Sequence, residues 1–165
     1  DTLQNLDIYR PDGAENAPAI IMLHGGAWRS GDKQSRRVWQ SKAQYWLPKG
    51  YVLVSVNTRL LPEAGPVAQA QDLAAAIAFI QQHAAQFGID PGKVILMGHS
   101  AGAHVAALVA TDDRIRRQAG VQRLQGTVIL DSAVLDVVGV MQENPGRLFR
   151  RAFGNTPAYW QSASP

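Results

Sequence analysis

The sequence contains no cysteine among its 165 residues. Disulfide bonds, thiolate nucleophiles and thiolate metal ligands are therefore excluded together. The four histidines offer no pair at the spacing of metal ligands on a helix. His99 and His104, for example, would lie about 140° apart around a helix. We expect no metal site and no cofactor.

Charged residues are also few, at 18% of the chain, and 16 Lys and Arg against 13 Asp and Glu leave a formal net charge of +3. The basic residues form short clusters, which we interpret as solvated helix faces or ends, and not one continuous stripe. No nucleic-acid partner is expected. The longest apolar runs, residues 19–23 and 105–110, are far shorter than the roughly 20 residues of a membrane-spanning helix. We therefore expect no membrane insertion.

The composition, with 46% hydrophobic residues and no internal repeat, is that of one folded domain over residues 1–165. The sequence begins at Asp1 and has no basic-then-apolar leader. This start favours a cytoplasmic protein, with a secreted protein whose leader has been removed as the alternative.

Five short segments have the pattern of β-strands. Residues 6–9 alternate between polar and apolar side chains and precede a turn, which is typical of an edge strand. Four further segments are continuously apolar and rich in β-branched residues, as strands buried on both faces are. They start roughly thirty to forty residues apart, which leaves room for crossover helices. The sequence therefore predicts an α/β fold with a mostly parallel sheet, its buried strands at residues 19–23, 51–56, 94–97 and 127–130.

Helical periodicity is clearest at residues 66–87, where apolar side chains recur every three or four positions. We expect Gln69 and Asp72 on the opposite, solvated side of this helix. Residues 35–47 and 100–111 are predicted to form two more helices. The pattern weakens over residues 132–165, which we expect to be loop with one or two short helices and to line part of a pocket.

One motif predicts a catalytic nucleophile. The segment GHSAG at residues 98–102 lies between a buried strand and an Ala-rich helix, which is the arrangement of a nucleophile elbow. Such a turn holds the serine, here Ser100, in strained dihedral angles. It also brings the strand and helix backbones so close together that Gly98 and Gly102 are needed.

A second motif, HGGAW at residues 24–28, follows the strand at residues 19–23. The backbone N–H groups of Gly25 and Gly26, together with that of Ala101 after the nucleophile, are predicted to form an oxyanion hole. The candidate linings of a substrate pocket are Trp28, Leu135 and Val138.

These two motifs and the segment NTRL at residues 57–60 resemble the successive signatures of the α/β-hydrolase fold, in its esterase/lipase branch related to hormone-sensitive lipase and kynurenine formamidase. The resemblance covers nearly the whole chain and implies that Ser100 is the nucleophile. Thr58 stands where those proteins usually have tyrosine. The resemblance also implies that the catalytic acid and histidine follow on loops after two further strands. Residues 1–165 would then be the first two-thirds of the enzyme, completed by another segment or a second chain.

None of the histidines is a good candidate for the catalytic base. His104 is the only one after the nucleophile and is tethered to the same helix, so we expect a structural role. His24 and His99 belong to motifs in which the resemblance implies a scaffolding role, and His83 is expected at the surface. Asp131 closes a strand, where some α/β hydrolases place their acid, but a capping role for it or for Asp136 is the preferred interpretation.

The favoured function is hydrolysis of small-molecule carboxylic esters through an acyl-enzyme on Ser100. Two alternatives remain open from the sequence. The first is amide hydrolysis of an N-formyl aryl substrate, which the same groups could perform. The second is a non-catalytic binding module on a hydrolase scaffold, since folds are reused for unrelated functions.

Overall fold

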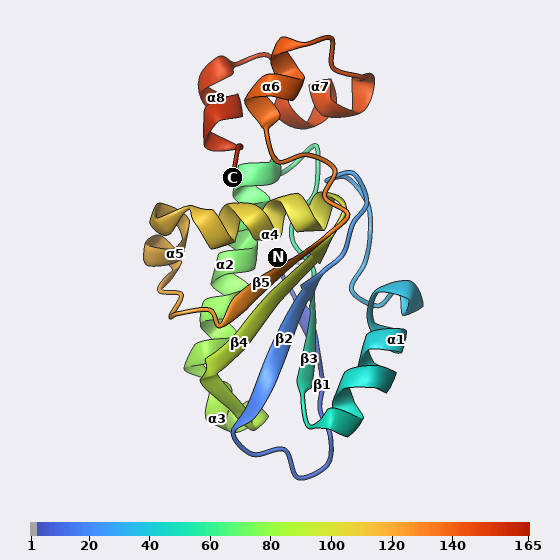
Figure 1. Ribbon diagram of the computed structural model, residues 1–165, viewed down its shortest axis with the longest axis vertical. Coiled ribbons are helices and arrows are strands. Elements are labelled where there is room, and N and C mark those ends of the chain that lie inside the picture. The colour runs from blue at the N-terminus through green and yellow to red at the C-terminus, as the bar shows by residue number, and fades with distance from the viewer. Residues whose placement is uncertain (1–2) are drawn as a thin grey trace.

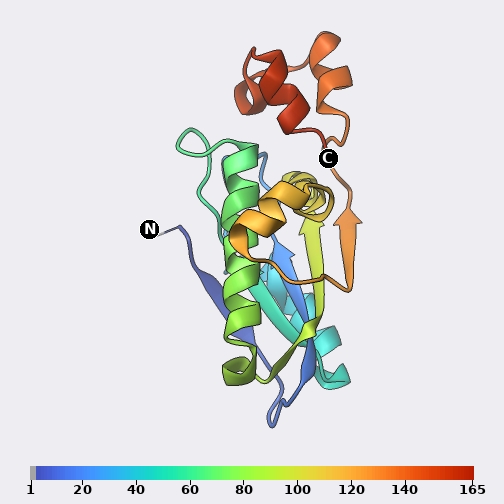
Figure 2. The ribbon, with the colours of Figure 1, turned by 90° about the vertical axis from the view of Figure 1, so that its left-hand side faces the viewer.

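The computed structural model describes residues 3–165 and contains a five-stranded sheet with helices on both faces (Figures 1 and 2). The strand order is β1-β3-β2-β4-β5. Only the β1–β3 pair is antiparallel, and the other three pairs are parallel. The predicted α/β fold with a mostly parallel sheet is confirmed. The strands are β1 (Leu6–Tyr9), β2 (Ala17–Leu23), β3 (Val52–Val56), β4 (Ile89–His99) and β5 (Gly126–Leu130).

The apolar strands bury both of their faces because successive side chains point to opposite sides of the sheet. In β2, Ile21 and Leu23 belong to the larger core cluster, whereas Ile20 and Met22 belong to a smaller one. The larger cluster lies under α2 (Pro66–Gln82) and α4 (Ala101–Thr111), and the smaller under α1 (Arg36–Trp46). A continuous apolar run is therefore what this position in the sheet requires.

The remaining helices are short. Those beside the sheet are η1 (Leu47–Lys49), α3 (Ala84–Phe87) and α5 (Asp113–Ala119). Three more lie beyond the carboxyl end of β5, above the top of the sheet in Figure 1. They are α6 (Val137–Gln142), α7 (Arg147–Phe153) and α8 (Pro157–Ser162), so residues 132–165 contain one helix more than the weak sequence pattern predicted.

Two predictions about the helix at residues 66–87 are wrong. The helix is interrupted at His83, which leaves α2 and the single turn α3. Gln69 and Asp72 are buried rather than solvated, at 2% and 8% exposure. The carboxylate of Asp72 binds Arg59 through both oxygens, and Gln69 donates to two backbone carbonyls. The loop after β3 supplies Arg59 and the carbonyl of Ala64, and the loop after β2 supplies the carbonyl of Trp28.

The side of β5 that faces α1 is uncovered. Val128 and Leu130 point to that side and are each 36% exposed. Because β5 pairs only with β4, its outer edge also carries unpaired backbone groups within residues 3–165. This half of the sheet face lacks the helix cover that α1 gives to β3.

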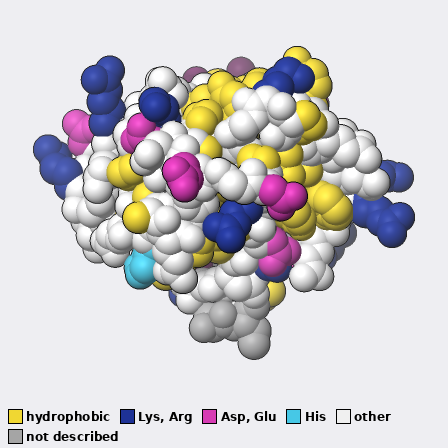
Figure 3. Space-filling model, turned by 90° about the horizontal axis from the view of Figure 1, so that it is seen from below, with side chains coloured by type: hydrophobic (Ala, Val, Ile, Leu, Met, Phe, Trp, Pro, Cys, Tyr) yellow, Lys and Arg dark blue, Asp and Glu magenta, His cyan; other side chains and the backbone are white. Residues whose placement is uncertain are grey.

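Charged side chains of both signs are interspersed among apolar atoms on the face that is remote from the carboxyl ends of the parallel strands β2, β3, β4 and β5 (Figure 3). Within residues 3–165, no helix combines the length and the hydropathy that crossing a bilayer requires.

Candidate active site

Ser100 occupies a sharp turn between β4 and α4, with φ 53° and ψ −120°. A residue other than glycine has a strained backbone when its φ is positive, and such strain is concentrated at functional sites. The backbone N–H of Ser100 donates to the carbonyl of Leu130 at 2.9 Å, which ties the turn to the end of β5. The Ser100 hydroxyl is half-buried and makes no hydrogen bond within residues 3–165. The predicted strained elbow is therefore present, and its hydroxyl is free.

The two glycines of the elbow have no room for a side chain. A Cβ on Gly98 would lie 2.2 Å from the carbonyl oxygen of Gly102. A Cβ on Gly102 would lie 2.2 Å from the carbonyl oxygen of His24. The elbow and the loop after β2 are thus in direct backbone contact, which brings the two sequence motifs together.

The loop after β2 lies beside the nucleophile. A Cβ on Gly25 would be 3.1 Å from the Cβ of Ser100. Within residues 3–165, the backbone N–H groups of Gly25, Gly26 and Ala101 donate no hydrogen bond. Gly25 and Ala101 also line one small cavity of about 10 Å³, of which Gly26 is not a lining residue. The participation of all three N–H groups in an oxyanion hole stays a prediction.

The backbone conformation of the loop after β2 was not predicted from the sequence. Ala27 and Trp28 follow Gly26 with φ values of 55° and 59°, both in the left-handed region. The turn is closed on the carbonyl of Gly26, which accepts from the N–H groups of Arg29 and Ser30. No local signal marks Ala27 and Trp28, because neither residue type favours positive φ.

The three residues expected to line the pocket differ in exposure. The indole of Trp28 is only 2% exposed and packs edge-on against Phe153 and His104. Trp28 contributes to the small cavity with Gly25 and Ala101, yet most of its ring is core. Leu135 is 48% exposed and Val138 is half-buried. Their contact with substrate stays a prediction.

His104 is a structural residue. Its side chain is fully buried, its Nδ1 accepts from Trp28 Nε1 at 3.2 Å, and its Nε2 donates to the carbonyl of Ala163 at 2.7 Å. Both ring nitrogens are therefore used. Burial lowers the pKa of His104 to about 4 because the charged form is desolvated, although the bond to Ala163 opposes this shift. A neutral imidazole that links α4 to the end of the chain cannot serve as the base.

This burial predicts a pH-dependent stability. The pKa of histidine is about 6.5 in an unfolded chain, so below that pH the unfolded state binds more protons than the folded state. Stability is then lost as the pH falls from about 6.5 towards 4. Between pH 7 and pH 4.5 His104 should account for about 2 to 3 kcal/mol of lost unfolding free energy. Urea unfolding of the wild type and of His104→Gln at both pH values measures this difference.

The expected result is a smaller loss in His104→Gln than in the wild type, whereas His83→Gln, at an exposed position, should leave the loss unchanged. Equal losses in all three proteins would contradict the assignment of His104 as a buried neutral group.

Within residues 3–165, none of the other three histidines makes a hydrogen bond to the Ser100 hydroxyl. The Nδ1 of His24 donates to the carbonyl of Gly25 at 2.7 Å, and its Nε2 is the one buried side-chain nitrogen or oxygen without a partner in the described part of the chain. His83 is exposed and bonds the carbonyl of Phe79. His99 is exposed and is the last residue of β4, directly before Ser100. The backbone bond of His24 agrees with its expected scaffolding role.

Of the two aspartates considered as caps, only Asp136 is one. Its carboxylate accepts from the N–H of Gly139 at the start of α6. Asp131 follows β5 with a positive φ of 49°, is exposed, and caps no helix among residues 3–165. Within the same range, no three His, Asp or Glu side chains gather in a group that could hold a metal ion.

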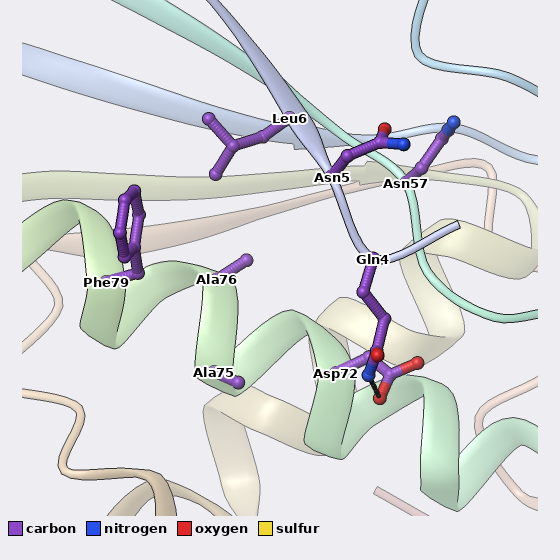
Figure 4. A pocket seen from close by; sticks show the side chains of 8 residues that line it. All are labelled: Gln4, Asn5, Leu6, Asn57, Asp72, Ala75, Ala76 and Phe79. Atoms are coloured by element: carbon purple, nitrogen blue, oxygen red, sulfur yellow. Dashed lines mark hydrogen bonds between the residues drawn. The ribbon is translucent and has the colours of Figure 1, made fainter. Parts of the chain in front are cut away.

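A larger cavity, of about 460 Å³, lies between β1 and α2 (Figure 4). Asp72 and Phe79 come from α2, and Gln4 reaches across from the chain before β1 to donate to Asp72 at 2.8 Å. Strands β3 and β2 separate β1 from β4, which carries Ser100. This cavity is therefore distinct from the elbow, and its carboxylate is already neutralised by Arg59.

Comparison with known proteins agrees with this geometry. The family model described as BD-FAE matches residues 6–143, which include both the HGGAW loop and the elbow. The chain belongs to the BD-FAE family. Esterase LipQ of Mycobacterium tuberculosis is 37% identical over 108 residues, covering 64% of this chain and 25% of LipQ. The carboxylic ester hydrolase LipN of the same organism is 32% identical over 119 residues, covering 68% of this chain and 30% of LipN.

Solved structures of esterases share the fold of this BD-FAE chain. Esterase B from Lactobacillus rhamnosis, inhibited by a tributyrin phosphonate, has a TM-score of 0.74 at 26% identity, covering 99% of this chain and 55% of its own. Esterase 2 of Thermogutta terrifontis has a TM-score of 0.72 at 23% identity, covering 97% of this chain and 60% of its own. The fold is thus the α/β-hydrolase fold. The chain spans about a quarter of the curated relatives' length and somewhat over half of these structures.

Proposed function

We propose that this BD-FAE chain carries the nucleophile and the oxyanion hole of a serine hydrolase that cleaves small-molecule carboxylic esters. The observation that carries the proposal is the strained Ser100 with a free hydroxyl, beside a loop in which the N–H groups of Gly25 and Gly26 have no partner within residues 3–165. The esterase names of the relatives support the same reaction class.

The chemistry follows from the position of each group. The Ser100 oxygen attacks the ester carbonyl while a base removes its proton, and the carbonyl oxygen becomes an oxyanion. The N–H groups of Gly25, Gly26 and Ala101 stabilise that charge, each donor contributing about 3 kcal/mol to transition-state binding. The alcohol then leaves with a proton, and water releases the acid from the acyl-enzyme.

The base and the acid are proposed to come from a further polypeptide segment or a second chain. Within residues 3–165, none of the four histidines is hydrogen-bonded to the Ser100 hydroxyl: His24, His83 and His104 are bonded to backbone carbonyls, and the side chain of His99 makes no hydrogen bond. The uncovered α1 side of β5, with Val128 and Leu130 exposed, is an apolar surface where such a segment could pack.

The oxyanion hole can be tested without the missing base. The chain has no cysteine, so Ser100→Cys creates one thiol at the elbow. The N-terminus of α4 and the N–H groups of the loop should stabilise the thiolate. We therefore expect a thiol pKa below about 7.5, against roughly 8.5 for a free cysteine. The pH dependence of alkylation by iodoacetamide measures this pKa.

The matched control is Gln71→Cys, at an exposed position within α2, where no helix terminus or N–H cluster is available and the residues three and four positions away are uncharged. Its thiol should titrate near 8.5. A Ser100→Cys thiol that titrates no lower than the Gln71→Cys thiol would refute the oxyanion hole.

A further inference from the structure

A second cavity adjoins the elbow on the α1 side of the sheet. It has a volume of about 180 Å³ and opens between α1 and the carboxyl ends of β2, β4 and β5. Sites for drug-sized ligands measure roughly 300–1,000 Å³, so this cavity suits a small chemical group. Its walls include Met22, Gly25, Arg37, Lys42, His99 and Leu130.

Two of these walls are cations without a counter-ion. Within residues 3–165, neither Arg37 nor Lys42 makes an ion pair or hydrogen bond, and no Asp or Glu lines the cavity. Arg37 is exposed and Lys42 is half-buried. The other cations of the described chain that are at least partly buried, Lys33, Arg59 and Arg116, each bind an aspartate. The cavity beside the elbow is therefore lined by two cations and by no carboxylate, which favours a positive potential there.

Lys42 is half-buried in this wall. Desolvation lowers its pKa from the usual value, and no anion compensates. A bound carboxylate would offset that cost, because an opposite charge within a few ångströms favours the charged amine. Arg37 adds a planar group whose donors match the two oxygens of a carboxylate.

One lining residue of the cavity, His99, directly precedes the nucleophile in the sequence. Gly25 and His99 belong to its walls, and a Cβ on Gly25 would lie 3.0 Å from His99 Nδ1 and 3.1 Å from the Cβ of Ser100. Part of an ester bound at Ser100 would therefore lie next to the cavity that the two cations line.

We propose that Arg37 and Lys42 bind a carboxylate carried by the substrate, so that the preferred esters have a free acid group a few atoms from the scissile carbonyl, as the monoesters of short dicarboxylic acids do. This inference rests on the proposed function, in which Ser100 is the nucleophile. A carboxylate on another polypeptide segment has the same chemistry and is the competing source.

The test compares two alkylating reagents of nearly equal size on the thiol of Ser100→Cys. Iodoacetate carries a carboxylate, and iodoacetamide is neutral. The ratio of their rate constants, each corrected for the thiolate fraction, is divided by the same ratio for Gln71→Cys. We expect this normalised ratio to be about ten at low salt and to fall towards one in 0.5 M salt, where surface charges are screened.

Substitutions of the two cations test whether they cause the preference for iodoacetate. Arg37→Gln and Lys42→Gln, each combined with Ser100→Cys, should lower the normalised ratio severalfold, and Lys42→Arg should retain it. Arg36→Gln is the matched control, since Arg36 is an exposed neighbour on the same helix and is not a wall of the cavity. It removes the same net charge and should leave the ratio unchanged.

A ratio near one, or an equal fall in Arg36→Gln and Arg37→Gln, would overturn the inference. Acetate that binds the cavity, detected through the amide signals of α1, without any preference at the thiol would assign the cavity to a carboxylate of another segment and overturn the substrate assignment. The thiol pKa of Ser100→Cys is measured independently. A low pKa with a ratio near one therefore rejects this inference and leaves the proposed function standing.

Discussion

Residues 1–165 alone are expected to hydrolyse activated esters about a millionfold more slowly than a serine hydrolase with its complete triad. Typical enzymes turn over at roughly 10 per second, so the expected rate is about 10⁻⁵ per second. The reason is the placement of the histidines. His104 is buried with both ring nitrogens bonded, and His24 is buried and bonded to its own loop. What remains is the contribution of the oxyanion hole and of substrate binding.

The measurement is the initial rate on 4-nitrophenyl butyrate, with Ser100→Ala as the control for contaminating esterases. His99→Ala and His104→Ala are assayed beside it. Turnover near 10 per second that disappears in Ser100→Ala and in one of the histidine variants would identify that histidine as the base. It would also refute the proposal that the base comes from elsewhere.

Gly102→Ala is expected to lower the unfolding free energy by about 4 kcal/mol or more, in the range that marks an exceptional substitution. The new methyl group would lie 2.2 Å from the carbonyl oxygen of His24 and 2.7 Å from that of Leu23, and both are backbone atoms at the end of β2. No side chain can move aside to relieve these contacts. Either α4 separates from the sheet or the loop after β2 shifts, and both changes disturb the elbow.

The control is Gly126→Ala at the start of β5, where a Cβ meets nothing within 4 Å and φ is not in the left-handed region. Stability should change there by less than about 1 kcal/mol. Denaturant unfolding of both variants measures the difference. A Gly102→Ala protein as stable as Gly126→Ala would show that the β2–α4 approach is not tight.

The sequence by itself determined the order of the five strands and of the three main helices between them, because each buried strand requires an apolar run and each crossover helix requires a periodic one. It also located the elbow. A serine between Gly98 and Gly102, after an apolar strand, has few alternative conformations, and the strained φ of Ser100 agrees with that expectation. These features depend on neighbours within a few residues, so a local pattern is sufficient to predict them.

Tertiary structure decided the polar contacts. Asp72 was predicted on a solvated face and is buried against Arg59, because the loop after β3 folds over α2. Trp28 was expected to line a pocket, and most of its ring is core because it meets His104 from a position 76 residues away. The helical period does not predict either partner, because it indicates only which face of a helix is apolar and not which polar groups of other segments contact it.

The same reason explains the cavity beside the elbow. Arg37 and Lys42 belong to a basic and polar stretch that the sequence indicates only as a helix surface, and His99 lies more than fifty residues later in the chain. Their convergence depends on α1 packing across β2 and on β4 ending next to it in the sheet. The charges of Arg37 and Lys42 can be read from the sequence. Their distance from Ser100 cannot, because the packing of α1 on the sheet sets it and local propensity does not.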